Sequence, residues 1–139
     1  MNTLQTRKWG AIIIALINVV DDDESIRFML RLMLERAGYD VVEAESGEEC
    51  LEKFDSIRPD LILLDIKMTG INGWDVCKEI KERIPEVLVP ISMLSGMKAE
   101  EDLRRSFEYA HADAHIKKPF DRAELLDTVK ILLEKSSYP

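Results

Sequence analysis

The sequence predicts an α/β fold in which a doubly wound, five-stranded parallel sheet is covered by helices on both faces. Short apolar runs without polar alternation are typical of strands buried on both faces. Each run is followed by a segment with apolar residues at every third or fourth position, as in a helix that packs on a core. The two patterns alternate along the whole chain, which favours right-handed parallel crossovers and the strand order 2-1-3-4-5 of a flavodoxin-like (βα)5 three-layer sandwich.

The first strand is expected within Ile12 to Val20, chiefly in the second half of this Ile- and Val-rich segment. Residues 1–9 are expected to form a leader that need not be ordered, before a single domain over residues 10–136 and a tail over residues 137–139. The apolar segment from Trp9 resembles a signal-peptide core. However, it runs into acidic residues rather than a cleavage site, and it is shorter than the ~20 residues of a membrane span.

The other elements follow from periodicity, strand composition and turn residues. A helix is expected from Ser25 to Gly38, with Asp23 or Glu24 at its amino end. The remaining expected elements are a strand at Tyr39 to Ala44, a helix from Ser46 to Ile57, a strand from Leu61 to Asp65, a helix from Gly73 to Pro85, a strand from Val87 to Leu94, a helix from Ala99 to Ala110, a strand from Ala112 to Ile116 and a last helix capped by Asp121.

Length, composition and net charge restrict the class of protein and the partners that it can have. The chain has 139 residues and 46% apolar content, which suits one domain with one core. Its formal net charge of -8 argues against direct binding of nucleic acid or an anionic membrane, and favours proteins or cations as partners. Cys50 and Cys77 lack the spacing of a metal or redox motif, which favours buried, inert thiols and a cytoplasmic protein.

Acidic residues follow the first and third strands, which the predicted order makes neighbours. Asp21 and Asp22 follow the first strand, and Asp65 ends the third. Ligands of such sheets bind outside the carboxyl ends of the strands at this switch point, so the three carboxylates should converge. Two carboxylates ~5 Å apart at an effective dielectric near 20 repel by about 3 kcal/mol, which a hard divalent cation offsets. Mg²⁺, or Mn²⁺, is therefore expected there, with a backbone carbonyl at about Lys67 as a further ligand.

Ser95 and Lys118 follow the fourth and fifth strands, at the same predicted edge. Alone, each is more often a turn hydroxyl or a surface charge. Together with the acidic residues they predict phosphoryl transfer, because a hydroxyl and an ammonium bind phosphoryl oxygens and a carboxylate can attack phosphorus. Asp65 is the expected nucleophile.

Four motifs, in this order, resemble those of the response-regulator receiver domain of two-component signalling: VVDDDESIR, LILLDIKMTGINGWDV, PISMLSG and KKPF. The resemblance covers about Asn18 to Lys135. It implies a stand-alone, chemotaxis-regulator-like receiver that catalyses only its own phosphorylation and dephosphorylation. It also implies that Asp65 accepts a phosphoryl group from a histidine kinase or phosphotransfer protein, and that Ser95 is the switch hydroxyl.

The resemblance implies further roles at the same edge. Lys118 would bind a phosphoryl oxygen, Asp22 would bind the metal directly, and Asp21 would act through water. The Lys118-Pro119 bond is expected to be cis, as X-Pro bonds permit.

Three residues depart from the family pattern. His115 occupies the place of an aromatic residue that swings inward as the hydroxyl moves; an ordinary, partly exposed strand histidine is an equal alternative. Thr69 stands where proline is frequent after Met68. His111 stands where glycine often ends the fourth helix, so a left-handed backbone there would be less comfortable.

The resemblance also implies an output surface on the fourth helix, fifth strand and fifth helix. Its expected basic residues, among acidic neighbours, are Lys98, Arg104, Arg105, Lys117 and Arg122. A downstream protein would bind there, and the chain would be a monomer or a weak dimer linked to phosphorylation. The open alternative is a constitutive interaction or dimerisation module with the same fold that is never phosphorylated.

Overall fold

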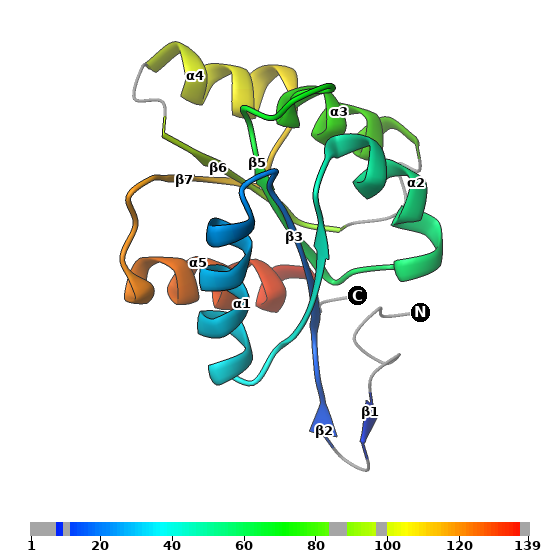
Figure 1. Ribbon diagram of the computed structural model, residues 1–139, viewed down its shortest axis with the longest axis vertical. Coiled ribbons are helices and arrows are strands. Elements are labelled where there is room, and N and C mark those ends of the chain that lie inside the picture. The colour runs from blue at the N-terminus through cyan, green and yellow to red at the C-terminus, as the bar shows by residue number, and fades with distance from the viewer. Residues whose placement is uncertain (1–7, 10–11, 84–88, 97–99, 137–139) are drawn as a thin grey trace.

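The computed structural model describes residues 8–9, 12–83, 89–96 and 100–136, and it has three layers with a parallel sheet in the middle (Figure 1). The sheet order is β4-β3-β5-β6-β7. Its strands are β3 (Leu16–Val20), β4 (Asp40–Ala44), β5 (Leu61–Asp65), β6 (Ile91–Ser95) and β7 (Ala114–Lys117). All neighbouring strands are parallel, so the predicted order 2-1-3-4-5 is confirmed.

Helices cover both faces of the sheet (Figure 1). On one face, α1 (Glu24–Arg36) and α5 (Arg122–Ser136) share a core that includes Leu30, Leu34, Leu125 and Val129. The other face carries α2 (Gly47–Ile57), α3 (Gly73–Arg83), α4 (Glu100–Arg104) and η2 (Arg105–Tyr109), a π-helical turn that continues α4. Its core includes Phe54, Trp74, Val76 and Ala110.

The predicted helix caps are confirmed. The Asp23 carboxylate accepts hydrogen bonds from the amides of Ser25 and Ile26 at the start of α1. Ser46 and Asp121 do the same for α2 and α5, through the amides of Glu49 and Glu124. At the other end of α1, Gly38 has φ +97°, a conformation that glycine adopts without strain.

The first sheet strand is shorter than the apolar segment that contains it. The Leu16 amide donates to the Asp60 carboxylate at 2.7 Å and the Leu16 carbonyl accepts from the Asp60 amide at 2.8 Å, which fixes the start of β3. The preceding residues form β2 (Ile12–Ile13), paired antiparallel with β1 (Lys8–Trp9). The expected leader therefore contains a short strand at its end. Residues 1–7 and the tail lie outside the described residues, and the domain limits stay predictions.

In the second half of the chain, one predicted strand start lies outside the described residues and another is shifted. The described part of the fourth strand is Ile91–Ser95, whereas Val87, its expected start, lies outside the described residues. The fifth strand begins at Ala114 rather than Ala112. The reason is that Ala112 donates its amide to the Ser106 carbonyl, and Asp113 accepts the Ile91 amide with its side chain, so both are used in the turn.

Both cysteines are buried, as predicted. Burial raises the pKa of Cys50 and of Cys77 to about 12, so both thiols stay protonated at neutral pH. None of the described helices is both long enough and apolar enough to cross a bilayer.

Candidate functional site

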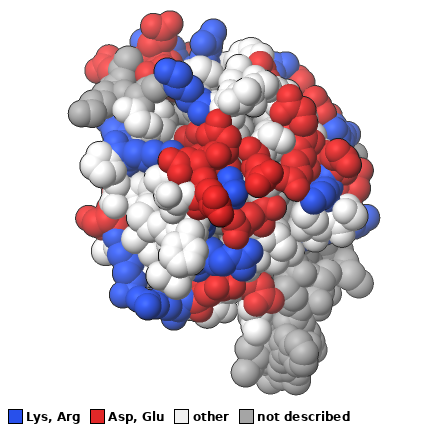
Figure 2. Space-filling model, in the orientation of Figure 1, with Lys and Arg blue, Asp and Glu red and all other residues white. Residues whose placement is uncertain are grey.

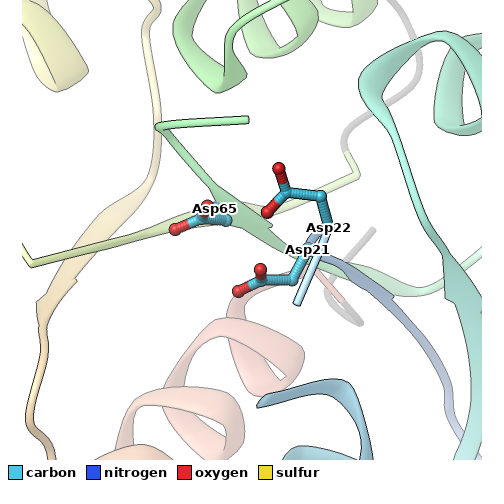
Figure 3. A group of neighbouring side chains, drawn as sticks. All are labelled: Asp21, Asp22 and Asp65. Carbon is cyan, nitrogen blue, oxygen red and sulfur yellow. The ribbon is translucent and has the colours of Figure 1, made fainter. Parts of the chain in front are cut away.

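The three predicted carboxylates meet at one edge of the sheet. Val20 at the end of β3 pairs with Leu64 in β5, so Asp21 and Asp65 follow neighbouring positions. One carboxylate oxygen from each of Asp21, Asp22 and Asp65 lies within 4.8 Å of the others. Figure 3 shows the three side chains gathered beyond the ends of β3 and β5. Asp21 and Asp65 are buried and Asp22 is exposed, so the group opens to solvent on one side.

Lys118 is brought to these carboxylates by the end of β7. Lys117 pairs with Ser95 of β6, and the Lys118 amide donates to the Ser95 carbonyl at 2.7 Å. The Lys118 Nζ then lies 3.0 Å from Asp21 Oδ2 and 2.9 Å from Asp65 Oδ1. The peptide bond that follows, Lys118-Pro119, is cis, as expected. One ammonium thus binds two buried carboxylates.

The site holds more negative than positive charge, because three carboxylates lie together with one ammonium. Burial raises the pKa of Asp65 to about 6; the hydrogen bond and charge of Lys118 oppose this rise, and Asp21 and Asp22 add to it. Burial lowers the pKa of Lys118, but its bonds to Asp65 and Asp21 outweigh that effect and leave the pKa above its usual value. Ionisation of Asp65 is therefore less favourable than in water, and further positive charge would favour it, although a pKa of about 6 leaves the group mostly ionised at neutral pH.

The loop after β5 is folded tightly against the site. The Thr69 amide donates to Asp22 Oδ2 at 3.2 Å, which connects this loop to the end of β3. Gly73 packs so closely that a side chain there would overlap the Asp65 carbonyl oxygen and the Ile66 Cα. Its amide donates to the Ile66 carbonyl at 2.8 Å. Only glycine fits this close approach.

Two other predicted site residues lie at the same edge. Ser95 is buried at the end of β6, the strand next to β5. Lys67 is exposed in the loop two residues after Asp65. The use of its backbone carbonyl as a metal ligand stays a prediction.

His115 is partly buried in β7, and its Nδ1 lies 2.8 Å from the Ser106 hydroxyl. Burial lowers the pKa of His115, and the Lys117 charge lowers it further. His115 is thus a partly exposed strand residue with a defined partner; its role in switching stays a prediction. His111 adopts φ +60°, the left-handed conformation that is less favourable for histidine than for glycine.

Sequence analysis missed Arg27, which supports the acidic pair. Its guanidinium donates to the Asp21 carbonyl at 2.7 Å and to Glu43 at 3.0 Å, while its side chain is almost fully buried. The signal was available, because Arg27 lies on the same helical stripe as Leu30 and Leu34. A charged residue on a core-facing stripe requires a partner.

Charge is unevenly distributed on the surface. On the face seen in Figure 2, acidic side chains form a broad patch that encloses a small basic area. Of the basic residues expected on the output surface, those described are all exposed: Arg104, Arg105, Lys117 and Arg122. Lys98 lies outside the described residues.

Comparisons with known proteins agree with the geometry. Residues 17–130 match the family model described as the response regulator receiver domain. The chain is 41% identical over 118 residues to the alkaline phosphatase synthesis transcriptional regulatory protein PhoP of Bacillus subtilis, a match that covers 85% of this chain and 48% of PhoP. It therefore spans about half the length of this curated relative.

Solved structures share the fold along almost their whole length. A putative response regulator from Chloroflexus aurantiacus superposes with a TM-score of 0.82 at 35% identity, over 87% of this chain and 98% of that one. Response regulator TrrA from Thermotoga maritima, solved in complex with Mg²⁺-BeF, gives a TM-score of 0.76 at 39% identity, over 86% and 99%.

Proposed function

This chain belongs to the response regulator receiver domain family of two-component signalling, and we propose that it accepts a phosphoryl group on Asp65 from a phosphohistidine donor. The observation that carries the proposal is the buried Asp65 carboxylate, which lies beside Asp21 and is bound by Lys118. The donor would be a histidine kinase or a phosphotransfer protein, the usual partners of receiver domains.

Phosphoryl transfer requires little beyond correct positioning of the reacting groups and stabilisation of the charge on the phosphoryl oxygens. An Asp65 carboxylate oxygen attacks phosphorus, an O–P bond forms, and the N–P bond of the donor imidazole breaks. The leaving imidazole keeps the electron pair of that bond and takes a proton from solvent. Lys118 is already held at Asp65 Oδ1, so its ammonium is ready to bind an oxygen of the incoming phosphoryl group. Ser95, at the end of the neighbouring strand, would supply a hydroxyl to another.

The residues present fit a hard divalent cation, Mg²⁺ or Mn²⁺. Three carboxylates offer oxygens within 4.8 Å of one another, and one ammonium serves two of them. Oxygen-only ligands with water on the exposed side suit Mg²⁺. Asp21, Asp22 and Asp65 would hold the ion, with the Lys67 carbonyl as a further ligand. When bound, it neutralises charge on the phosphoryl oxygens during transfer.

Phosphorylation would act by biasing two conformations a few kcal/mol apart. Ser95 would move toward the phosphoryl group, and His115 on the adjacent strand would respond. The exposed basic residues of the α4–η2, β7 and α5 surface would then bind a downstream protein differently. The protein would act in the cytoplasm as a monomer or as a weak dimer linked to phosphorylation.

A phosphorylation-independent interaction module is the competing function. The burial of Asp21 and Asp65 argues against it, because burial disfavours the ionised form of Asp65 and Lys118 offsets that effect only in part. Docking alone would not require buried carboxylates at this edge.

Addition of Mg²⁺ and a small acyl-phosphate donor tests the proposal. Trp74 follows Gly73, whose backbone packs on the Asp65 carbonyl, so its fluorescence should change with the donor in wild type. The change should be lost in Asp65→Asn and kept in Asp40→Asn, a control at an exposed carboxylate at the start of β4. A donor response that survives in Asp65→Asn would overturn the proposal.

A further inference from the structure

We infer that Ser106 is a positioning residue that couples Trp74 to His115 and fixes the His115 ring as its Nε2–H tautomer. Ser106 lies in η2 and is fully buried. Its hydroxyl accepts a hydrogen bond from Trp74 Nε1 at 2.9 Å and lies 2.8 Å from His115 Nδ1. It thus joins α3 to β7.

The direction of the hydrogen bonds follows from the groups involved. The indole nitrogen of Trp74 can only donate, so it uses a lone pair of the Ser106 oxygen. The Ser106 proton then needs an acceptor. Among the described residues, the hydrogen bonds of this hydroxyl are to these two rings alone, and only His115 Nδ1 can accept. The neutral imidazole therefore carries its proton on Nε2.

The other side of the ring has no such support. His115 Nε2 is buried and has no hydrogen-bond partner among the described residues. A buried N–H without an acceptor is unfavourable, so the Nε2 side of the ring does not hold it in place. The hydrogen bond between Nδ1 and Ser106 therefore sets the orientation of the ring. Loss of the Ser106 hydroxyl should free it.

Protonation of His115 conflicts with the same chain of bonds. An imidazolium donates from both nitrogens, so Ser106 would have to accept from Trp74 and His115 together and leave its own proton unpaired. Among the described residues, two charged side chains act on the ring: Lys117 on β7 opposes its positive charge, and Asp102 on α4 favours it more weakly. On the Trp74 side, the Arg105 guanidinium lies 5.0 Å from the ring centroid.

The two ends of this chain of bonds lie near the site. Trp74 follows Gly73, which packs on the Asp65 carbonyl, and His115 lies three residues before Lys118. If Asp65 accepts the phosphoryl group, as proposed above, Ser106 gives it a connection to β7 through α3 and η2, separate from Ser95.

Nuclear magnetic resonance of the full chain tests the coupling without a phosphoryl donor. The chain has two histidines, and exposed His111 provides an internal reference. An Asp65→Asn background removes another group that titrates near pH 6. At about pH 8, ring-nitrogen shifts should report His115 as the Nε2–H tautomer. The Trp74 indole N–H signal should then titrate with the midpoint of His115. An Nδ1–H tautomer, or an indole signal that ignores His115, would overturn the inference.

Substitution then identifies Ser106 as the link. Ser106→Ala should abolish the joint titration and leave a mixture of His115 tautomers, while Ser92→Ala, which removes another fully buried hydroxyl, should change neither. Unaltered tautomer and coupling in a folded Ser106→Ala would contradict the inference. If this variant does not fold, the measurements with an intact Ser106 still decide it.

Beryllofluoride with Mg²⁺ separates this inference from the proposed function. In wild type it should shift the Trp74 indole signal together with His115, and in Ser106→Ala it should bind but leave the two signals uncoupled. A wild type that does not bind beryllofluoride would count against the proposed function alone. Binding that moves His115 but not Trp74 would count against Ser106 as the link.

Discussion

The acidic edge and the α4–η2–β7 segment are held together by opposite kinds of interaction. At the edge, three carboxylates lie together, one ammonium binds two of them, and burial raises the pKa of Asp65 to about 6. In the segment, Ser106 and His115 form neutral hydrogen bonds with each other and, through Ser106, with Trp74 of the neighbouring helix α3. The edge is short of positive charge, whereas the segment is short of one hydrogen-bond acceptor.

This difference indicates how each region could change state. An unbalanced cluster of charges responds to ligands that bring or remove charge, such as a cation or a phosphoryl group. A neutral chain of hydrogen bonds responds to rotation or protonation of one of its members. The following substitutions test whether the unbalanced charge and the tight packing at the acidic edge determine its contribution to the stability of the fold.

The largest effect is expected from Lys118→Met. It would leave buried Asp21 and Asp65 without their shared cation, and breaking a buried ion pair costs about 3–5 kcal/mol. The free energy of unfolding in urea, measured without metal at about pH 7.5, should fall by that amount. Lys117→Met, which removes the adjacent but exposed lysine, should change it by less than about 0.5 kcal/mol. Equal losses of unfolding free energy in the two variants would show that the Lys118 ammonium does not specifically stabilise the buried carboxylates.

A smaller effect is expected from the titration of Asp65. Because its folded-state pKa is raised from 3.8 to about 6, the folded protein binds this proton more tightly than the unfolded chain does. Stability without metal should therefore be highest below about pH 4 as far as this group is concerned, and fall by about 2–3 kcal/mol as pH rises through about 6.

Asp65→Asn removes this titration and should be more stable than wild type at about pH 7.5, with no such gain at about pH 4. Asp40→Asn is the matched control at an exposed site and should follow wild type. Thermal unfolding in a chelator across this pH range measures both. A wild type that gains stability between about pH 4 and 7, relative to Asp65→Asn, would contradict the sign.

The smallest of the three effects is expected from Gly73→Ala. The added methyl group would overlap the Asp65 carbonyl, so the loop must shift, at about 1–3 kcal/mol. Gly96→Ala provides the control, because a Cβ there meets nothing within 4 Å. The urea midpoint should fall in the first variant and stay nearly unchanged in the second. The same midpoint in both would show that the approach of Gly73 to Asp65 tolerates a side chain.

The acidic edge could be predicted from sequence because each of its residues ends or follows a strand of the sheet. Once the strands are recognised, parallel pairing alone brings Asp21, Asp65, Ser95 and Lys118 to one edge. The same reasoning gave the order of the sheet. The end of a strand or the cap of a helix depends on a few residues that are adjacent in sequence, so the local sequence pattern is sufficient to locate it.

The α4–η2–β7 segment could not be predicted in the same way. Its π-helical turn changes which residues of 100–110 face the sheet, and a regular helical period does not reveal such a turn. Ser106 therefore gave no signal, although it is fully buried. The start of β3 depended on Asp60, which lies 44 residues away in sequence, and this too is a tertiary contact that propensity cannot supply.

Direct location of the phosphoryl group tests the central claim best. Wild-type protein is mixed with an acyl-phosphate donor with and without Mg²⁺, and peptide mapping by mass spectrometry locates any covalent phosphate. The expected result is one phosphoryl group, on the peptide that carries Asp65, formed with Mg²⁺ and absent both in Asp65→Asn and in a chelator. Phosphate on another residue, or none with donor and Mg²⁺ both in excess, would contradict the assignment of Asp65 as the acceptor.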